Sequence, residues 1–236
     1  MEPGRWIVEH VHGFNEHTVV SVVPPVFASY ARIFHPAKDV DGEPVRWAEV
    51  AAANGTTTAH PVMDWGSVAG GWRTPGQPRL WHEAPEHGSL PPRTARAVAG
   101  VSPTLHPHTR AVLVPHWEGS GRITAPETYP RLPMPGREHM ILFSGGIALA
   151  DTRFGGDVFG MSAHPWWSED HAWCVATDID LMTTYLGASA ACVDAVLADP
   201  IAPTISFCGG DLAPPMECLL NRAGRPHDSS HHRASA

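Results

Sequence analysis

The segment HPWWSEDHAWCVATDIDL, from His164 to Leu181, concentrates side chains that can do chemistry. It places two histidines, three tryptophans, one cysteine and four acidic residues within eighteen positions. Its second part, Ala172–Leu181, alternates with period two and predicts a strand. One face carries Trp173, Val175, Thr177, Ile179 and Leu181, and we expect this face to lie on the core. The other face carries Ala172, Cys174, Ala176, Asp178 and Asp180.

Two carboxylates follow one another on that second face, Asp178 and Asp180 at the carboxyl end of the strand. Carboxylates at i and i+2 can pair with arginines, bind a hard cation, or divide acid and base roles. They can equally cap turns or the start of a helix near Thr183–Ser189. Both interpretations stay open from the sequence.

The residues before the strand suggest a recognition surface. Adjacent Trp166 and Trp167 cannot both point into one core from a strand, so we expect at least one at the surface or in a cleft wall. The alternative is that both cover the edge of the core. His171 could act as a general base that is oriented by the carboxylate of Asp170. However, no sequence motif identifies a serine or threonine as its nucleophile, and the thiol of Cys174 would point to the opposite face of the strand from His171.

A second candidate lies in HWEGSG, His116–Gly121. A strand over Thr109–Gly119 would end at Trp117 and Glu118, and these two side chains would then meet the central segment at one end of the sheet.

Several chemistries are excluded at the level of motif. The chain has no phosphate-cradling glycine loop and no G-x-S-x-G elbow. HEAPEH, His82–His87, has one residue too many for a zinc helix, and Pro85 forbids a regular helix. The four cysteines match no zinc spacing. We therefore expect neither a metal nor a cofactor.

Composition narrows the partners. The formal charge of −8 argues against nucleic acid and anionic membranes, which need a basic face. No stretch approaches the roughly 20 apolar residues of a membrane span, and no signal peptide is visible. The expectation is a cytoplasmic protein with reduced thiols that meets a protein partner or a small-molecule ligand.

The remaining elements favour an α+β fold: a mostly antiparallel sheet with helices on one face and long irregular loops. We expect one domain over 1–220 and a disordered polar tail over 221–236. The sequence predicts strands at Thr18–Phe27, Thr109–Gly119 and Arg137–Gly146, and helices at Glu43–Gly55, Pro91–Ala99 and Ala188–Pro200. It predicts a strand or a helix at Phe27–Ala37. We expect a long surface loop at Met63–Leu90, anchored by Trp65, Trp72 and Trp81.

Six segments resemble, in order, a family of uncharacterised actinobacterial proteins. They are VPPVFASYARIFHPA, VRWAEVAAANG, GSLPPRTARAVA, HWEGSGRI, REHMILFSGG and PWWSEDHAWCVATDIDLMTTYLGAS, and they span most of Val23–Pro200. This chain has Ser168 where the family has a proline, and His171 where the family has an arginine. A histidine is a weaker base than an arginine, so a buried salt bridge at this position is less expected here. The resemblance implies no activity, cofactor or catalytic residue.

These observations favour a binding or regulatory module over an enzyme. Its candidate binding residues are Trp117, Glu118, Trp166, Trp167, Asp170, His171, Asp178 and Asp180. The alternative is a hydrolase, with or without assistance from a metal, that uses Asp178, Asp180, His171 and Glu118.

Overall fold

The structure is a computed structural model of the 236-residue chain. It describes residues 4–13, 18–56, 63–70, 80–105, 111–121, 123, 125–155, 161–163, 165–202 and 204–207. The tail expected over 221–236 lies outside these residues. Within them, no helix is long and apolar enough to cross a membrane.

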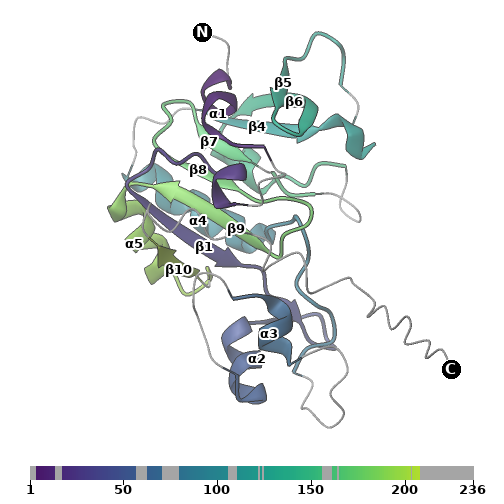
Figure 1. The fold of residues 1–236 in the computed structure, drawn as a ribbon, viewed down its shortest axis with the longest axis vertical. Coiled ribbons are helices and arrows are strands. Elements are labelled where there is room, and N and C mark those ends of the chain that lie inside the picture. Colours follow the sequence, from purple (N-terminus) through teal and green to yellow (C-terminus); the bar gives the residue numbers. More distant parts are fainter. Residues whose placement is uncertain are drawn as a thin grey trace, which may run out of the picture.

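An eight-stranded sheet, antiparallel at every described pairing, forms the centre of the molecule (Figure 1). Its strand order is β10-β1-β9-β8-β7-β4-β6-β5. The strands are β1 (Ser29–Phe34), β4 (Val112–Trp117), β5 (Arg131–Met134), β6 (Arg137–Gly145), β7 (Trp166–Ser168), β8 (Cys174–Ala176), β9 (Thr183–Ala188) and β10 (Thr204–Phe207). The predicted α+β class with a mostly antiparallel sheet is confirmed.

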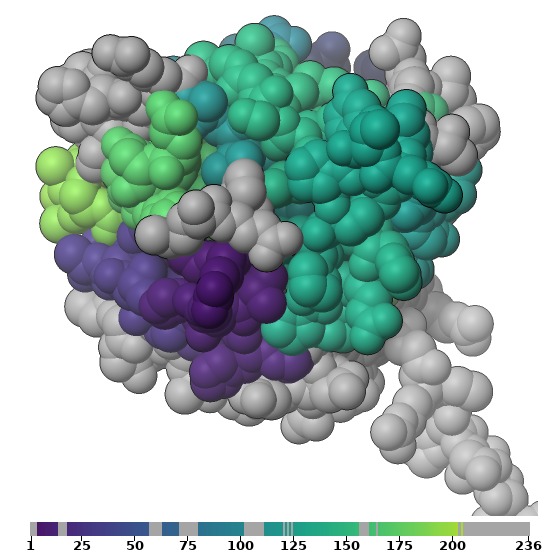
Figure 2. Space-filling view, turned by 90° about the horizontal axis from the view of Figure 1, so that it is seen from above, coloured from purple at the N-terminus to yellow at the C-terminus, as the bar shows by residue number. Residues whose placement is uncertain are grey.

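Helices cover the sheet in an uneven way. The two long helices α4 (Pro92–Leu105) and α5 (Ala190–Ala198) pack together with the 3-10 helix η4 (Ile147–Asp151) on one face. The other face is covered by the N-terminal α1 (Arg5–His10) and the 3-10 helix η2 (Val19–Ser21). In Figure 2 the purple N-terminal segment lies against the teal β5–β6 region, and α1 contacts β5. Both faces of the central part of the sheet are therefore covered.

A smaller layer lies beside the sheet. Helices α2 (Trp47–Asn54) and α3 (Trp65–Ala69) pack on each other, near the two-stranded sheet β2 (Ala37–Lys38) and β3 (Pro44–Val45). Trp47 and Trp65 meet with ring centroids 5.3 Å apart, and Trp65 meets Trp81 at the same distance. Trp65 and Trp81 are thus anchors, as expected, but the predicted loop contains α3. Trp72 lies outside the described residues.

Local signals located two helices well. Ser189 caps α5 by accepting a hydrogen bond from the backbone N–H of Cys192, and Cys192, Val193 and Val196 are buried. Gly55 ends α2 in the left-handed region at φ 63°, where a residue without Cβ is favoured. Pro44 lies in β3 and not in the first turn of α2, however, so the helix begins later than predicted.

Other boundaries differ from the sequence prediction. The β-branched stretch Thr18–Phe27 is no strand: it forms η2 and turns, with Thr18 and Ser21 bonded to each other across η2. The predicted strand Ala172–Leu181 is regular only over β8, and a turn at Asp178–Leu181 leads into β9. Helix α4 is longer than predicted and runs on to Leu105.

Candidate functional site

Asp178 is held by its own turn and by an arginine from another hairpin. Its Oδ1 accepts a hydrogen bond from the backbone N–H of Asp180 at 3.2 Å, and Arg137 Nη2 donates to its Oδ2 at 2.5 Å. The Asp178 and Arg137 side chains are 7% and 18% exposed. Turn capping and arginine pairing, two of the roles left open by the sequence, are both present at this one carboxylate.

The hairpin that supplies Arg137 is fixed by its turn. Pro135 and Gly136 connect β5 to β6, and Gly136 has φ 79°. Proline followed by a glycine with positive φ is typical of a type II turn. Met134 pairs with Arg137 directly across this turn.

Trp117 lies on the other side of the Arg137 guanidinium. The Cζ of Arg137 is 5.2 Å from the centre of the Trp117 ring, within the range of a cation–π contact. Arg137 therefore joins two sequence candidates, Trp117 from β4 and Asp178 from the turn after β8. We expected Trp117 and Glu118 at the end of β4 to lie near the end of the central segment, and for Trp117 this is correct.

A pocket opens beside this pair, and we call it the Arg137 pocket. It is open to the surface, and its empty space of about 430 Å³ includes solvent outside the protein. Its lining includes Val22, Met134, Met140, Arg137, Thr177 and Asp178. Pro165, just before β7, lines it too, so the pocket lies where four segments converge: the segment at η2, the β5–β6 hairpin, the start of β7 and the end of β8.

Burial dominates the electrostatics of Asp178. It raises the pKa of the carboxyl above its ordinary value, and the neighbouring Arg137 and the Asp180 backbone N–H partly oppose this rise. The positive charge of Arg137 therefore favours the ionised form of the Asp178 carboxyl, which burial disfavours. Asp180, by contrast, is exposed, so the two aspartates have different environments despite their i, i+2 spacing.

Trp166 and Trp167 are both buried, 1% and 0% exposed, and the expectation that one would reach the surface is wrong. They point to opposite faces of the sheet. Trp166 packs on Trp173 at 5.0 Å within the α4–α5 core, whereas Trp167 belongs to the core under α1 and η2. Each adjacent tryptophan has its own core because both faces of the sheet are covered.

Asp170 and His171 lie in the turn between β7 and β8. Asp170 Oδ1 accepts from the backbone N–H of Ala172 at 3.3 Å, and Ser168 Oγ accepts from the same N–H at 2.8 Å. His171 is exposed, has φ 58°, and packs against Trp6 of α1 with ring centroids 4.6 Å apart. Desolvation lowers the pKa of His171, and Asp170 opposes the shift. This contact docks α1 on the sheet.

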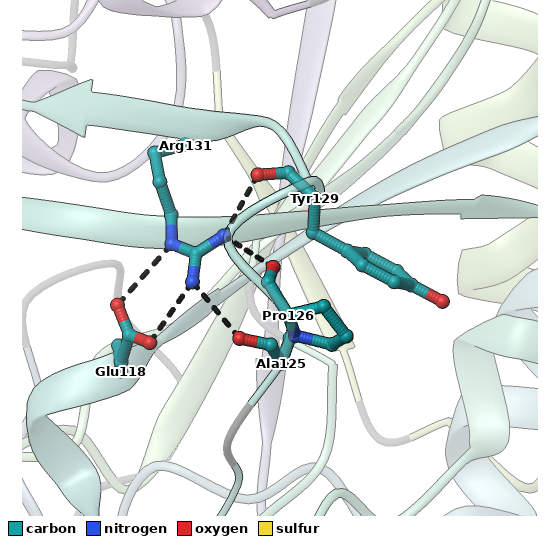
Figure 3. Close-up of polar contacts among 5 residues, drawn as sticks. All are labelled: Glu118, Ala125, Pro126, Tyr129 and Arg131. Carbon is teal, nitrogen blue, oxygen red and sulfur yellow. Dashed lines mark hydrogen bonds and ion pairs between the residues drawn. The ribbon is translucent and has the colours of Figure 1, made fainter.

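Glu118 is part of a separate polar cluster (Figure 3). Arg131 binds both of its carboxylate oxygens, at 3.2 and 3.0 Å. The same guanidinium donates to the backbone oxygens of Ala125, Pro126 and Tyr129. All these bonds serve to hold the loop before β5, so Glu118 does not join Trp117 at Arg137.

The other groups with chemical potential are dispersed. Cys174 is fully buried, which raises the pKa of its thiol and makes it a poor nucleophile. Across the described ranges, no group of three or more His, Cys, Asp or Glu side chains could hold a metal ion. His82 and His87 of HEAPEH are exposed.

Sequence reasoning missed His35 and Arg137. His35 is fully buried; its Nδ1–H donates to the Glu86 carbonyl at 2.7 Å and its Nε2 accepts from the Thr184 hydroxyl at 2.8 Å. Burial lowers its pKa to about 4. The position of Arg137 directly after a turn could have been predicted, because Met134-Pro135-Gly136-Arg137 has the residue order of a type II turn.

Comparison with known proteins gave no match: no protein-family model, no curated protein and no solved structure is similar to the chain. The function of the protein is therefore inferred from the geometry of the chain itself.

Proposed function

We propose that the protein is a cytoplasmic binding module, not an enzyme, and that it holds a small ligand in the Arg137 pocket. One observation carries this proposal: the ion pair of Arg137 and Asp178, from two separate segments, lines the pocket, and Trp117 of β4 packs on the Arg137 guanidinium. Ligand sites commonly combine apolar walls with a few convergent polar groups. The buried thiol of Cys174 fits a reducing compartment.

The walls of the pocket suit recognition. Met134 and Met140 flank Arg137, and methionine side chains adapt to ligands of irregular shape. The ion pair can fix the orientation of a bound group, because a charged donor and a charged acceptor lie side by side.

The positions of the catalytic candidates favour binding over hydrolysis. His171 precedes β8 and contacts α1, whereas Asp178 follows β8, so they lie at opposite ends of that strand. Glu118 is bound by Arg131. A general base and its reacting partner must be within about 3 Å of a shared substrate atom. The hydrolase hypothesis therefore gains no support from the described residues.

A ligand screen with two matched double variants tests the proposal. Arg137→Met/Asp178→Asn removes the pocket pair without leaving a buried charge alone. Arg96→Met/Asp151→Asn removes the ion pair between α4 and η4, 2.6 Å long, which involves none of the pocket residues. Small-molecule fractions of a cell extract are added, and the melting temperature is measured for each protein.

We expect a fraction that raises the melting temperature of the wild type and of the α4–η4 variant, but not of the pocket variant. A fraction that stabilises all three proteins equally would place the binding site elsewhere. If no fraction stabilises the wild type, the binding proposal fails.

A further inference from the structure

We infer that the ligand of the Arg137 pocket is a small uncharged molecule with an amide group on an apolar tail. This inference rests on the proposed function, because it names the ligand class of the same site. The amide N–H would donate to Asp178 and its carbonyl would face the guanidinium of Arg137.

Asp178 has the capacity to accept a further donor. An ionised carboxylate offers about four lone-pair sites. Among the described residues, Asp178 side-chain oxygens accept two hydrogen bonds, one from Arg137 and one from the backbone of Asp180. The residue is only 5% exposed, so water has little access to the remaining sites. A ligand N–H in the pocket would complete the set.

Charge balance argues for an uncharged ligand. Arg137 and Asp178 place opposite charges side by side in the wall of the pocket. An anion would meet Asp178, and a cation would meet Arg137, so each would lose hydration without a net electrostatic gain. Desolvating an amide costs far less than desolvating an unpaired ion, and its adjacent C=O and N–H match the donor and acceptor of the pair.

The apolar part of the ligand follows from the remaining walls. Val22, Met134 and Met140 line the pocket around the ion pair. Thr177 adds no spare donor, because its hydroxyl donates to the Thr183 carbonyl at 2.7 Å. A short branched hydrocarbon tail would therefore contact carbon and sulfur atoms, where burial of apolar surface is favourable.

Three probes share the same branched hydrocarbon tail and differ in the charge of the polar group. They are the uncharged 3-methylbutanamide, the anion 3-methylbutanoate and the cation 3-methylbutylammonium. Each is titrated into protein labelled at the methionine methyl groups, and NMR follows Met134 and Met140. Met134→Leu and Met140→Leu assign the signals, since Leu and Met exchange with little loss of stability. The Arg137→Met/Asp178→Asn variant serves as the control.

We expect the amide to shift both signals with saturation, about tenfold or more tightly than either ion, and this preference to vanish in the control variant. Equal or tighter binding of an ion overturns the amide inference but leaves the binding module intact. If none of the probes shifts Met134 or Met140, while an extract fraction does, the ligand class is wrong and the proposed function stands. If neither does, both fail.

Discussion

Arg137 and Met140 lie on the same face of the sheet although they are three residues apart in one strand. In a regular strand, residues separated by an odd number face opposite sides. Here Met134 pairs with Arg137 and Leu132 pairs with Met140, so β6 has two residues, Glu138 and His139, opposite one residue of β5. This bulge turns Arg137 toward Trp117 and Asp178.

The bulge makes substitutions at His139 informative, since His139 is exposed and has φ 63°. Left-handed φ costs a residue with a Cβ about 1–2 kcal/mol, and more for a β-branched one. We expect His139→Gly to equal or exceed the wild type in free energy of unfolding, and His139→Val to fall below it by about 1–2 kcal/mol. Urea denaturation measures both.

Glu138→Val is the control, because it adds the same side chain to the adjacent exposed position without a positive φ. If both valine variants lose equal stability, the cost comes from the hydrophobic side chain, and the strain argument at His139 is wrong.

Removal of Arg137 alone should destabilise the protein more than removal of the whole pair. Arg137→Met leaves Asp178 buried without its cation, at a cost of about 3 kcal/mol near neutral pH. Arg137→Met/Asp178→Asn should return to within about 1 kcal/mol of the wild type. Chemical denaturation of the wild type, both single variants and the double variant forms the thermodynamic cycle.

The same pair predicts a pH dependence. The folded-state pKa of Asp178 is raised by burial, so the folded protein keeps this proton to higher pH than the unfolded chain. Stability from this group is therefore lost as pH rises through its folded-state pKa. Arg137→Met removes the cation that opposes this rise, so the pKa of Asp178 rises further in the variant. The loss in free energy of unfolding of the variant relative to the wild type should therefore become smaller as pH falls toward about pH 4, where Asp178 is protonated. A deficit independent of pH would contradict this account.

His35 should make the protein lose stability in mild acid. Its folded-state pKa of about 4 lies below the ordinary 6.5, so the unfolded chain binds a proton that the folded protein does not. Stability is present above about pH 6.5 and falls as pH decreases, by about 2 kcal/mol at pH 5. His35→Gln should flatten this slope, whereas the exposed His82→Gln should retain it. Equal slopes in both variants would assign the effect to other groups.

Local signals were sufficient for helices and turns. The cap at Ser189 and the glycine at Gly55 act within a few residues, so their positions could be predicted from the sequence. The alternation of Ala172–Leu181 was also real, but it continued through the turn at Asp178, where the backbone already bends. Periodicity alone does not mark the end of a strand.

The site depended on contacts that no local pattern encodes. Arg137 and Asp178 are 41 residues apart, and the segment at η2, which lines part of the pocket, comes from a third region of the chain. The expectation for Trp166 and Trp167 assumed one core, whereas α1 and η2 supply a second core on the opposite face. A short N-terminal helix far away in sequence decided the environment of Trp167.

The turn that carries Asp178 has a close neighbour in Gly88. A Cβ on Gly88 would lie 2.6 Å from the Cα of Ile179, and the Gly88 N–H donates to the Leu181 carbonyl at 2.8 Å. Gly88 has φ +63°, and Gly42 has φ +83°, but a Cβ on Gly42 would meet no atom within 4 Å among the described residues. The two glycines thus share a left-handed backbone but only Gly88 faces a steric clash.

Alanine at the two positions separates backbone strain from this contact. We expect Gly42→Ala to cost about 1 kcal/mol and Gly88→Ala about 3 kcal/mol. Because Gly88→Ala must displace the turn, it should also shift the methyl signals of Met134 and Met140, whereas Gly42→Ala should not. Equal losses in both variants, with unchanged methionine signals, would show that Gly88 does not position Asp178.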